Sequence, residues 1–332
     1  MHRTQKMFSN RAKFNHFLQT LSVTLLHVVQ FSGATHIPSI IILYQLFFYT
    51  PLWPFMLLYL SWTYLAEWKT PERGGRDLLR NFMRRLPIFK LMRDYYPITL
   101  VKTRDLDPQK NYIFGYHPHG VFTEGASIGL NTEACGFSEK FPGIIPHLSV
   151  TSVILKPLLY RDILMSLGVI DVSRDSLEYN LTQKGAGHSV VIVVGGAAEI
   201  REMGFDSYAL IMKRRKGFIK LALQTGCDLV PVFGFGQNNL YLNIIGGSSC
   251  SQYSRPQLWF RNFTSYLRTC FLPTRSPINV VVGSPISVSK IDIPRKEDID
   301  KLHTRYIDEL KELYENYKDK YHPSERSELL II

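Results

Sequence analysis

The stretch YIFGYHPHGVF, residues 112–122, decides how the rest of this chain is expected to fold. Its first five residues are apolar, aromatic or glycine, which is typical of a strand that is buried on both faces of a sheet. Pro118 separates His117 from His119 and has no backbone N–H to donate to a strand ladder. The histidine pair is therefore expected at the end of the strand or in the turn that follows.

Other parts of the chain show the same alternation of strands and helices. Short β-rich runs that end at glycine or proline occur in three places: HSVVIVVGG (188–196), DLVPVFGFG (228–236) and INVVVGSP (278–285). KGFIKLALQTG (216–226) is typical of a helix that Gly226 caps. After Pro294 a long helix is expected, with one apolar stripe made of Ile299, Leu302, Tyr306, Leu310, Leu313 and Tyr317. The pattern predicts an α/β fold with a mixed or parallel sheet and helices on its faces.

The histidine pair supports three hypotheses. A His-x-His spacing can ligate zinc, but the other histidines that would have to help, His147, His188 and His303, are scattered along the chain. The second hypothesis is structural, with both rings satisfied by backbone groups in the turn. The third is a general base, because imidazole titrates near neutral pH and can take a proton from a hydroxyl. Strand ends are where sheet enzymes place their chemistry, so His117 and His119 are candidate catalytic residues.

A histidine base works best beside a carboxylate that orients its ring and stabilises its cation. Glu124, Glu133 and Glu199 are the candidates for that partner. Glu199 directly follows a predicted buried strand and should lie at the sheet edge where His119 also emerges, so it ranks first. Glu124 and Glu133 are interpreted more readily as solvated loop residues.

The N-terminal region has a different composition from the rest. No Asp, Glu, Lys or Arg occurs from Phe14 to Ala66, and residues 37–66 form an apolar run longer than the roughly 20 residues of a straight membrane span. Pro51 and Pro54 interrupt it. Basic residues on both sides favour a membrane hairpin with two cytosolic ends over a single kinked span. We therefore expect a basic tail with a candidate interfacial helix (1–36), a helical membrane hairpin (37–68) and a cytosol-facing domain (69–332).

The net charge of +11 would suit a nucleic-acid partner, but much of the excess basic charge borders the hydrophobic run. That placement favours anionic membrane lipids as partners and no nucleic acid. The four cysteines contain no Cys-x-x-Cys pair, which argues against a zinc ribbon or a disulfide framework. A homo-oligomer is compatible with the sequence.

Five ordered blocks give the chain a family resemblance. They are HPHG (117–120), FPGIIPH (141–147), VVGGAAE (193–199), RRKGFIKLAL (214–223) and DLVPVFGFGQN (228–238). In this order they resemble the diacylglycerol acyltransferase type 2 family, which includes monoacylglycerol and wax-alcohol acyltransferases. The resemblance implies a glycerolipid-acyltransferase-like fold and an enzyme of the endoplasmic reticulum membrane and lipid droplets. Such an enzyme moves a fatty acyl group from acyl-CoA, its co-substrate, to a lipid hydroxyl, with no cofactor.

The resemblance also implies roles for single residues. It favours His119 as the catalytic histidine and Glu199 as its carboxylate partner. Two positions depart from the family pattern: Gln237 stands where the family usually has glutamate, and Glu124 where relatives mostly carry an apolar or small residue. Diacylglycerol is the expected acceptor, because the central members of the family use it. Monoacylglycerol and a long-chain alcohol are the alternatives, and a non-catalytic membrane scaffold is an alternative of another class.

No Gly-x-Ser-x-Gly elbow occurs in the chain. A direct transfer is therefore expected, in which His119 deprotonates the acceptor hydroxyl as it attacks the thioester, and backbone N–H groups of HPHG or GGAAE stabilise the oxyanion. The segment MKRRKGF (212–218) begins a predicted helix and should bind the phosphates of CoA, with Arg174 as a weaker candidate. The candidate substrate-binding residues are Pro118, Gly120, Gly195, Gly196, Arg214, Arg215, Lys216 and Gly217. The aromatic segment 257–271 is interpreted either as a membrane-lying border of the acyl entrance or as a core helix.

Overall fold

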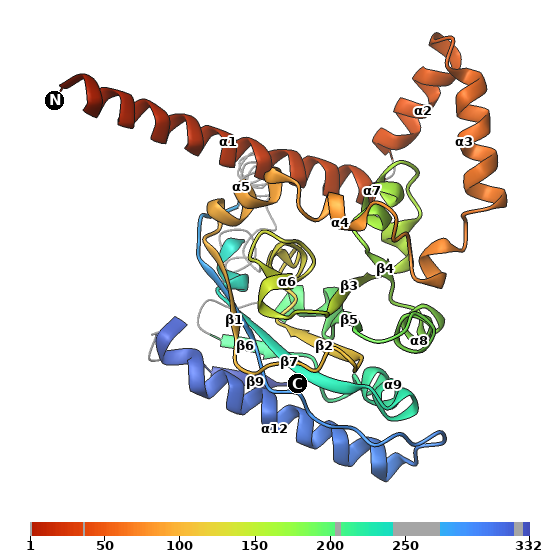
Figure 1. Ribbon diagram of the computed structural model, residues 1–332, viewed down its shortest axis with the longest axis vertical. Coiled ribbons are helices and arrows are strands. Elements are labelled where there is room, and N and C mark those ends of the chain that lie inside the picture. The colour runs from red at the N-terminus through yellow and green to blue at the C-terminus, as the bar shows by residue number, and fades with distance from the viewer. Residues whose placement is uncertain (1, 36, 203–206, 242–272, 322–327) are drawn as a thin grey trace, which may run out of the picture.

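The computed structural model describes residues 2–35, 37–202, 207–241, 273–321 and 328–332 of the chain. Its main body is a seven-stranded sheet in the order β1-β8-β7-β2-β5-β3-β4, with helices on both faces (Figure 1). Neighbouring strands are parallel except for β7 and β8, which are antiparallel, so the sheet is mixed. The aromatic segment 257–271 lies outside the described residues.

The strands of the main sheet are β1 Ile98–Lys102, β2 Tyr112–His117, β3 Ile145–Val150, β4 Ile170–Asp171, β5 His188–Val193, β7 Asp228–Phe235 and β8 Ile278–Val282. A separate parallel pair is made of β6 Ser207–Leu210 and β9 Glu328–Ile331. The α-helices are α1 His2–Thr35, α2 Ile37–Tyr49, α3 Trp53–Leu65, α4 Arg80–Met83, α5 Pro87–Tyr95, α6 Phe137–Lys140, α7 Tyr160–Ser166, α8 Arg174–Thr182, α9 Gly217–Thr225 and α12 Lys296–Tyr321. Short helical turns are η1 Thr70–Arg73, η2 Gly125–Leu130 (a π-helix), η3 Ser152–Leu155, η4 Gly196–Glu202 and η5 Gln237–Leu240.

The four strands predicted from the sequence are confirmed as β2, β5, β7 and β8, and the first ends at His117, where Pro118 was expected to stop it. Gly226 caps α9 as predicted, because its φ of +73° suits a left-handed cap and its N–H donates to the Ala222 carbonyl at 2.8 Å. The C-terminal helix α12 also has its predicted apolar stripe, with Leu302, Tyr306, Leu310 and Leu313 buried and Ile299 and Tyr317 partly buried.

The two faces of the sheet are covered by two hydrophobic clusters. One includes Phe114 of β2 and Val23 of α1, together with residues of α5, η2 and α6. The other includes Ile113 of β2, Ile219 of α9 and Leu310 of α12. Because successive side chains of a strand point to opposite faces, β2 contributes to both clusters and is buried along its whole length. The strand that leads to the histidines is therefore enclosed on both faces, as is its neighbour β7.

The N-terminal membrane hairpin in the predicted fold class is wrong. The apolar run 37–66 folds as two helices, α2 and α3, joined by residues 50–52, with Pro51 in the connection and Pro54 in the first turn of α3. Each helix has 13 residues, which gives a length of roughly 20 Å, short of the about 30 Å of a bilayer core. Among the described residues, no helix combines the length and the apolar character needed to cross a membrane. The fold is α/β, with a mixed sheet and helices on its faces. The division into segments 1–36, 37–68 and 69–332 stays a prediction.

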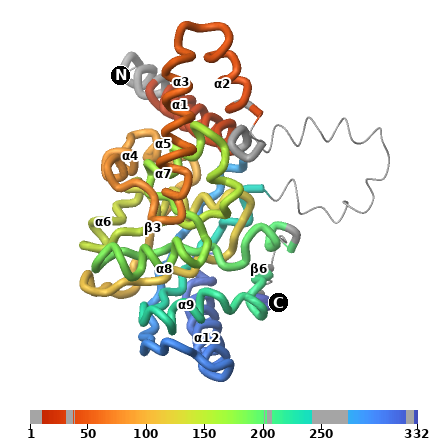
Figure 2. The backbone as a smooth tube through the Cα atoms, turned by 90° about the vertical axis from the view of Figure 1, so that its right-hand side faces the viewer, coloured from red at the N-terminus to blue at the C-terminus, as the bar shows by residue number. Residues whose placement is uncertain are grey.

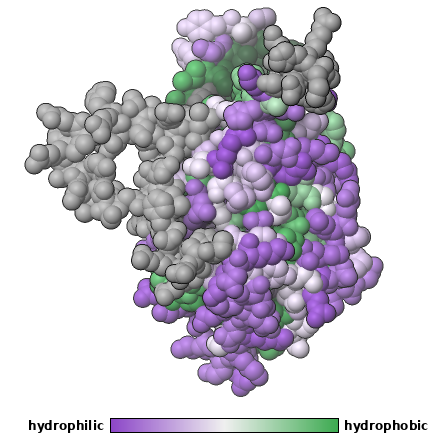
Figure 3. Space-filling model, turned by 90° about the vertical axis from the view of Figure 1, so that its left-hand side faces the viewer, coloured by the Kyte–Doolittle hydropathy of each residue, from purple (hydrophilic) through white to green (hydrophobic). Residues whose placement is uncertain are grey.

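The helical pair α2 and α3 lies at the end of the molecule opposite α12 (Figures 1 and 2). Large apolar side chains are exposed there, including Phe55 at 69% and Leu58 at 68%. Hydrophobic residues gather near this end in Figure 3, whereas hydrophilic residues cover much of the α12 end. Asp162 of α7 anchors the pair to the body, because it accepts hydrogen bonds from Tyr59 at 2.6 Å and Arg76 at 2.7 Å.

We predict that Gly115→Ala lowers the free energy of unfolding by about 1–3 kcal/mol, as overpacking of a core does. A Cβ at residue 115 would stand 1.9 Å from the Oη atom of Tyr306, so β2 and α12 would have to separate. Chemical denaturation measures the difference.

Gly217→Ala is the matched control, because nothing lies within 4 Å of the position that its Cβ would take. That change should shift the free energy of unfolding by less than about 0.5 kcal/mol. Equal stability of the Gly115→Ala variant and the wild type would contradict the close approach of β2 to α12.

Candidate active site

The HPHG turn follows β2 at the carboxyl end of the parallel strands. β2 lies between β7 and β5 in the sheet. The His117–Pro118 peptide bond is cis, and Gly120 has a φ of +65°. A Cβ at residue 120 would stand 2.8 Å from the Cγ atom of Gln237. Glycine is therefore needed at position 120 for its backbone conformation and for the space it leaves.

His117 is enclosed in the core. Its side chain has no exposed surface, and its Nε2 atom lies 3.0 Å from the Oη atom of Tyr306 on α12. Tyr306 also donates to the Gly115 carbonyl at 3.2 Å, so the ring of His117 is held against α12. Burial lowers the pKa of His117 to about 3. His117 is thus neutral. Its enclosed position fits the structural hypothesis better than the hypothesis of a base that meets a substrate.

His119 is partly exposed and has a defined tautomer. Its Nδ1 atom lies 2.7 Å from the Gly120 carbonyl oxygen. A carbonyl can only accept, so Nδ1 carries the proton and Nε2 carries the lone pair. Burial lowers the pKa of His119, while the Gly120 hydrogen bond and the charge of Glu124 raise it by less. The ring is therefore a neutral imidazole with a basic nitrogen at Nε2.

Glu199 lies beside His119, but it holds the backbone rather than the ring. Its Oε2 atom accepts the N–H of His119 at 2.9 Å, and its Oε1 atom accepts the N–H of Ile211 at 2.9 Å. Burial raises the pKa of Glu199 to about 7, against the lowering effect of these two bonds and of Arg215. Glu199 is therefore at the turn, as expected, but the group that orients the imidazole of His119 is the Gly120 carbonyl. The His119 amide is engaged by Glu199, so it does not serve as an oxyanion donor.

The other two glutamates have different surroundings. Glu133 pairs with Arg84 at 3.1 Å and accepts hydrogen bonds from the backbone N–H and the hydroxyl of Ser138. Glu124 is fully buried next to the turn and accepts hydrogen bonds from Gln237 and Tyr241. Sequence reasoning missed this burial, since a charged residue after a glycine-rich turn is usually solvated. It also missed His27 of α1, which contacts both Tyr241 and Glu124.

Basic residues surround a pocket of about 420 Å³ between α8, α9 and the end of β5. The predicted residues Arg214, Arg215, Lys216 and Gly217 line it together with Arg174, and Lys220 adds a further cation. The pocket adjoins the turn before Glu199, because Arg215 donates to the Gly195 carbonyl at 3.2 Å. Cations at the first turn of a nine-residue helix form an arrangement that suits a phosphate.

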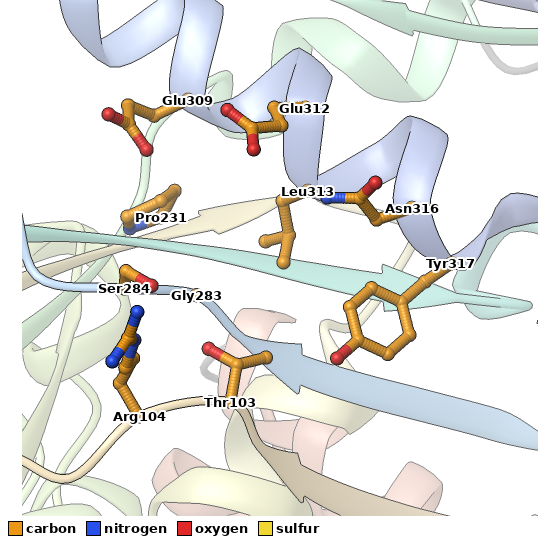
Figure 4. A pocket seen from close by; sticks show the side chains of 10 residues that line it. All are labelled: Thr103, Arg104, Pro231, Gly283, Ser284, Glu309, Glu312, Leu313, Asn316 and Tyr317. Atoms are coloured by element: carbon orange, nitrogen blue, oxygen red, sulfur yellow. The ribbon is translucent and has the colours of Figure 1, made fainter.

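A second, smaller pocket of about 210 Å³ lies between α12 and the sheet (Figure 4). It contains Arg104, Glu309, Glu312 and Ser284. Gly283 of its wall donates to the Pro231 carbonyl in the first half of β7, so the pocket is near the opposite end of the strands from the HPHG turn. It plays no part in the site around His119. Within the described ranges, no group of three or more His, Cys, Asp or Glu residues could hold a metal ion.

Comparisons with known proteins agree with the order of motifs in the chain. A family model described as "Diacylglycerol acyltransferase" matches residues 45–332. "Diacylglycerol O-acyltransferase 2" of Danio rerio is 40% identical over 333 residues, which cover 97% of this chain and 91% of that protein. "Acyl-CoA wax alcohol acyltransferase 1" of Homo sapiens is 40% identical over 305 residues, covering 88% of this chain and 92% of that protein.

A solved structure, the 1-acyl-sn-glycerophosphate acyltransferase PlsC from Thermotoga maritima, aligns with 93% of this chain and 100% of its own at 12% identity and a TM-score of 0.43. A similarity of this size does not establish a common fold. The family match and the sequence relatives, in contrast, span nearly the whole chain and confirm the resemblance. The chain therefore belongs to the diacylglycerol acyltransferase family.

Proposed function

We propose that this protein transfers a fatty acyl group from acyl-CoA to the free hydroxyl of diacylglycerol, forming triacylglycerol, with His119 as the general base. The observation that carries the proposal is the state of the His119 ring. Its Nδ1–H is bound to the Gly120 carbonyl, which leaves Nε2 with a lone pair in a partly exposed side chain. Relatives of about the same similarity carry the names of diacylglycerol and wax-alcohol acyltransferases.

In the proposed reaction, Nε2 of His119 removes the proton of the acceptor hydroxyl while that oxygen attacks the thioester carbonyl. The new C–O bond gives a tetrahedral oxyanion. When the oxyanion collapses, the C–S bond breaks and the CoA thiolate leaves, taking back the proton from the imidazolium of His119. The Gly195–Gly196 turn is the candidate for oxyanion stabilisation that remains from the sequence, because the His119 amide is engaged by Glu199.

The basic pocket suits the other end of acyl-CoA. CoA carries a pyrophosphate and a 3′-phosphate, and five cationic side chains line the pocket: Arg174, Arg214, Arg215, Lys216 and Lys220. Lys216 also pairs with Asp300 at 2.6 Å and Arg174 with Glu178 at 3.4 Å, so Arg214, Arg215 and Lys220 are the first candidates to bind the ligand. Arg215 donates to the Gly195 carbonyl, so the pocket adjoins the turn that carries Glu199. Phosphates bound in this pocket would leave the thioester near His119.

We extend the proposal to the location of the protein. Both the acceptor and the product are neutral lipids, and the net charge of +11 favours a surface of anionic lipid. The endoplasmic reticulum membrane, and lipid droplets where triacylglycerol accumulates, are therefore the proposed sites of action, with residues 69–332 facing the cytosol. Imaging of the tagged protein tests this part.

The first prediction concerns the base. His119→Ala should lower kcat by about 10²–10⁴-fold, because it removes general-base assistance while the substrate sites remain. The measurement is transfer of a labelled acyl group from acyl-CoA to diacylglycerol, with a monoacylglycerol and a long-chain alcohol as competing acceptors. The preferred acceptor should be diacylglycerol.

His16→Ala is the matched control, because His16 is exposed on α1 and its change should leave the rate within about two-fold of wild type. Full activity of the His119→Ala variant would remove the proposed base. Preference for the long-chain alcohol would assign the chain to the wax-alcohol reaction instead.

The second prediction is the pH profile. A general base is active only when neutral, and burial lowers the pKa of His119 from its ordinary value of 6.5. The acid limb of kcat/KM should therefore lie below pH 6.5, with activity maintained down to that point and lost as the ring is protonated. Rates are measured at several pH values, with the folded fraction followed by fluorescence at each. An acid limb above pH 6.5 would contradict the assignment.

The third prediction concerns the phosphate site. Arg174→Gln and Arg214→Gln should each raise the KM for acyl-CoA by roughly three- to ten-fold with little change in kcat, since they remove a charged hydrogen bond that is equal in ground and transition states. Arg104→Gln, in the pocket near the opposite end of the strands, should leave KM unchanged. A thioester of dephospho-CoA, which lacks the 3′-phosphate but keeps the pyrophosphate, shows which of the two groups each arginine binds. Unchanged KM in both variants for either thioester would exclude this pocket.

A further inference from the structure

A buried polar cluster lies directly beneath the His119 turn. Its members come from separate parts of the chain: Glu124 before η2, Gln237 of η5, Tyr241 after η5, Tyr116 of β2 and His27 of α1. All five side chains are at most 1% exposed. Buried polar groups cost free energy unless they are hydrogen-bonded, so a cluster of this size specifies one arrangement when its bonds are satisfied.

Gln237 is held in a single orientation. Its Oε1 atom accepts the backbone N–H of Gly125 at 2.9 Å and the hydroxyl of Tyr116 at 3.1 Å. Its Nε2 atom donates to the Oε2 atom of Glu124 at 2.7 Å. The N–H of Gly125 must meet an oxygen, so the amide cannot flip. Both ends of the side chain are therefore fixed.

This fixed side chain supports the residue that orients the catalytic ring. Gly120 packs on Gln237 so closely that a Cβ at residue 120 would stand 2.7 Å from Nε2 and 2.8 Å from Cγ. The carbonyl of the same Gly120 accepts the Nδ1–H of His119 at 2.7 Å. A displacement of Gln237 would therefore move Gly120 and rotate or release the imidazole.

Glu124 connects this support to the N-terminal helix. Its Oε1 atom accepts the hydroxyl of Tyr241 at 2.5 Å, and the Nε2 atom of His27 lies 3.6 Å from the same oxygen and contacts Tyr241. The Nδ1 atom of His27 lies 2.8 Å from the Val23 carbonyl of its own helix, to which it donates. The chain of contacts thus runs from α1 through Tyr241, Glu124 and Gln237 to Gly120.

We propose that Glu124 and Gln237 form a positioning pair that holds the His119 imidazole in its catalytic orientation through Gly120. His27 and Tyr241 connect this pair to α1. Neither residue of the pair touches the substrate, so both act through His119. The inference rests on the proposed function in one respect, that His119 is the base.

The pair offers a reciprocal exchange as its test. In Gln237→Glu, two carboxylates would face each other where 2.7 Å now separates an amide from a carboxylate, and kcat should fall by about ten- to a hundredfold through loss of orientation. In the double variant Glu124→Gln/Gln237→Glu, the amide of residue 124 can donate to the carboxylate of residue 237, which still accepts from Gly125 and Tyr116. The double variant should therefore recover kcat to within about three-fold of wild type.

Three readouts separate positioning from a merely structural effect. The KM for acyl-CoA should stay within about two-fold of wild type in both variants, because the phosphate site is elsewhere. Thermal unfolding reports whether each variant is folded. Nitrogen NMR of histidine-labelled protein, assigned by comparison with His119→Ala, reports the His119 tautomer without turnover. It should show loss of the Nδ1–H form in Gln237→Glu and its return in the double variant.

Gln109→Glu is the control for the chemical change, because Gln109 is exposed before β2, at the opposite end of that strand. It should behave as wild type. If Gln237→Glu does not fold, Gln237→Met, of similar size but without hydrogen bonds, carries the test and should lower kcat while it stays folded.

The outcomes are distinguishable. A folded Gln237→Glu or Gln237→Met variant with wild-type kcat, or a double variant no more active than Gln237→Glu, would overturn the positioning pair. A wild-type protein that transfers no acyl group, or a fully active His119→Ala variant, would overturn the proposed function, and NMR would still decide whether the pair sets the tautomer of His119.

Discussion

The site depends on one hydrogen bond, from the Nδ1–H of His119 to the carbonyl of Gly120. It fixes the tautomer, and so it decides that Nε2 carries the lone pair. The carbonyl takes this position because the backbone of Gly120 is in the left-handed region, where residues with a Cβ are strained. Gln237 also fills the space that a Cβ at residue 120 would need, so only glycine fits there. The geometry of one glycine therefore determines whether the imidazole can act as a base.

The order of strands explains how distant residues meet at this turn. β2 lies between β5 and β7, and all three are parallel, so their carboxyl ends lie side by side. The segment after β5 supplies Glu199 to the His119 amide, and the segment after β7 supplies Gln237 beneath Gly120. The turn is thus held from both neighbouring strands. The same segment after β5 connects the site to the basic pocket, through the bond of Arg215 to the Gly195 carbonyl.

Much of this arrangement could be predicted from the sequence, because it depends on patterns within short segments. The strands, the cap at Gly226, the stripe of α12 and the placement of Glu199 after a buried strand all follow from spacing and turn residues. Contacts between segments could not be predicted. Nothing in the order of residues shows that Glu199 bonds the amide of His119 rather than its ring, or that Glu124 and Gln237 face each other. The sequence predicts an interfacial helix within residues 1–36, and this prediction does not show that α1 places His27 and Val23 in the core.

Burial acts in opposite directions on the two ionisable groups of the turn, and its effect favours the proposed chemistry. It lowers the pKa of His119 and raises that of Glu199 to about 7, so both groups tend toward their neutral forms. A neutral imidazole is ready to accept a proton, and the ionised form of Glu199 beside it favours the imidazolium that results. Water at the turn would return both pKa values toward their ordinary positions and leave a permanent charge on Glu199. The N-terminal helix contributes to the burial of the segment after the turn, because the ring of His27 packs 5.3 Å from that of Phe122, three residues beyond His119. The docking of α1 therefore reaches the surroundings of the base through His27, which contacts Glu124, the charge that raises the pKa of His119.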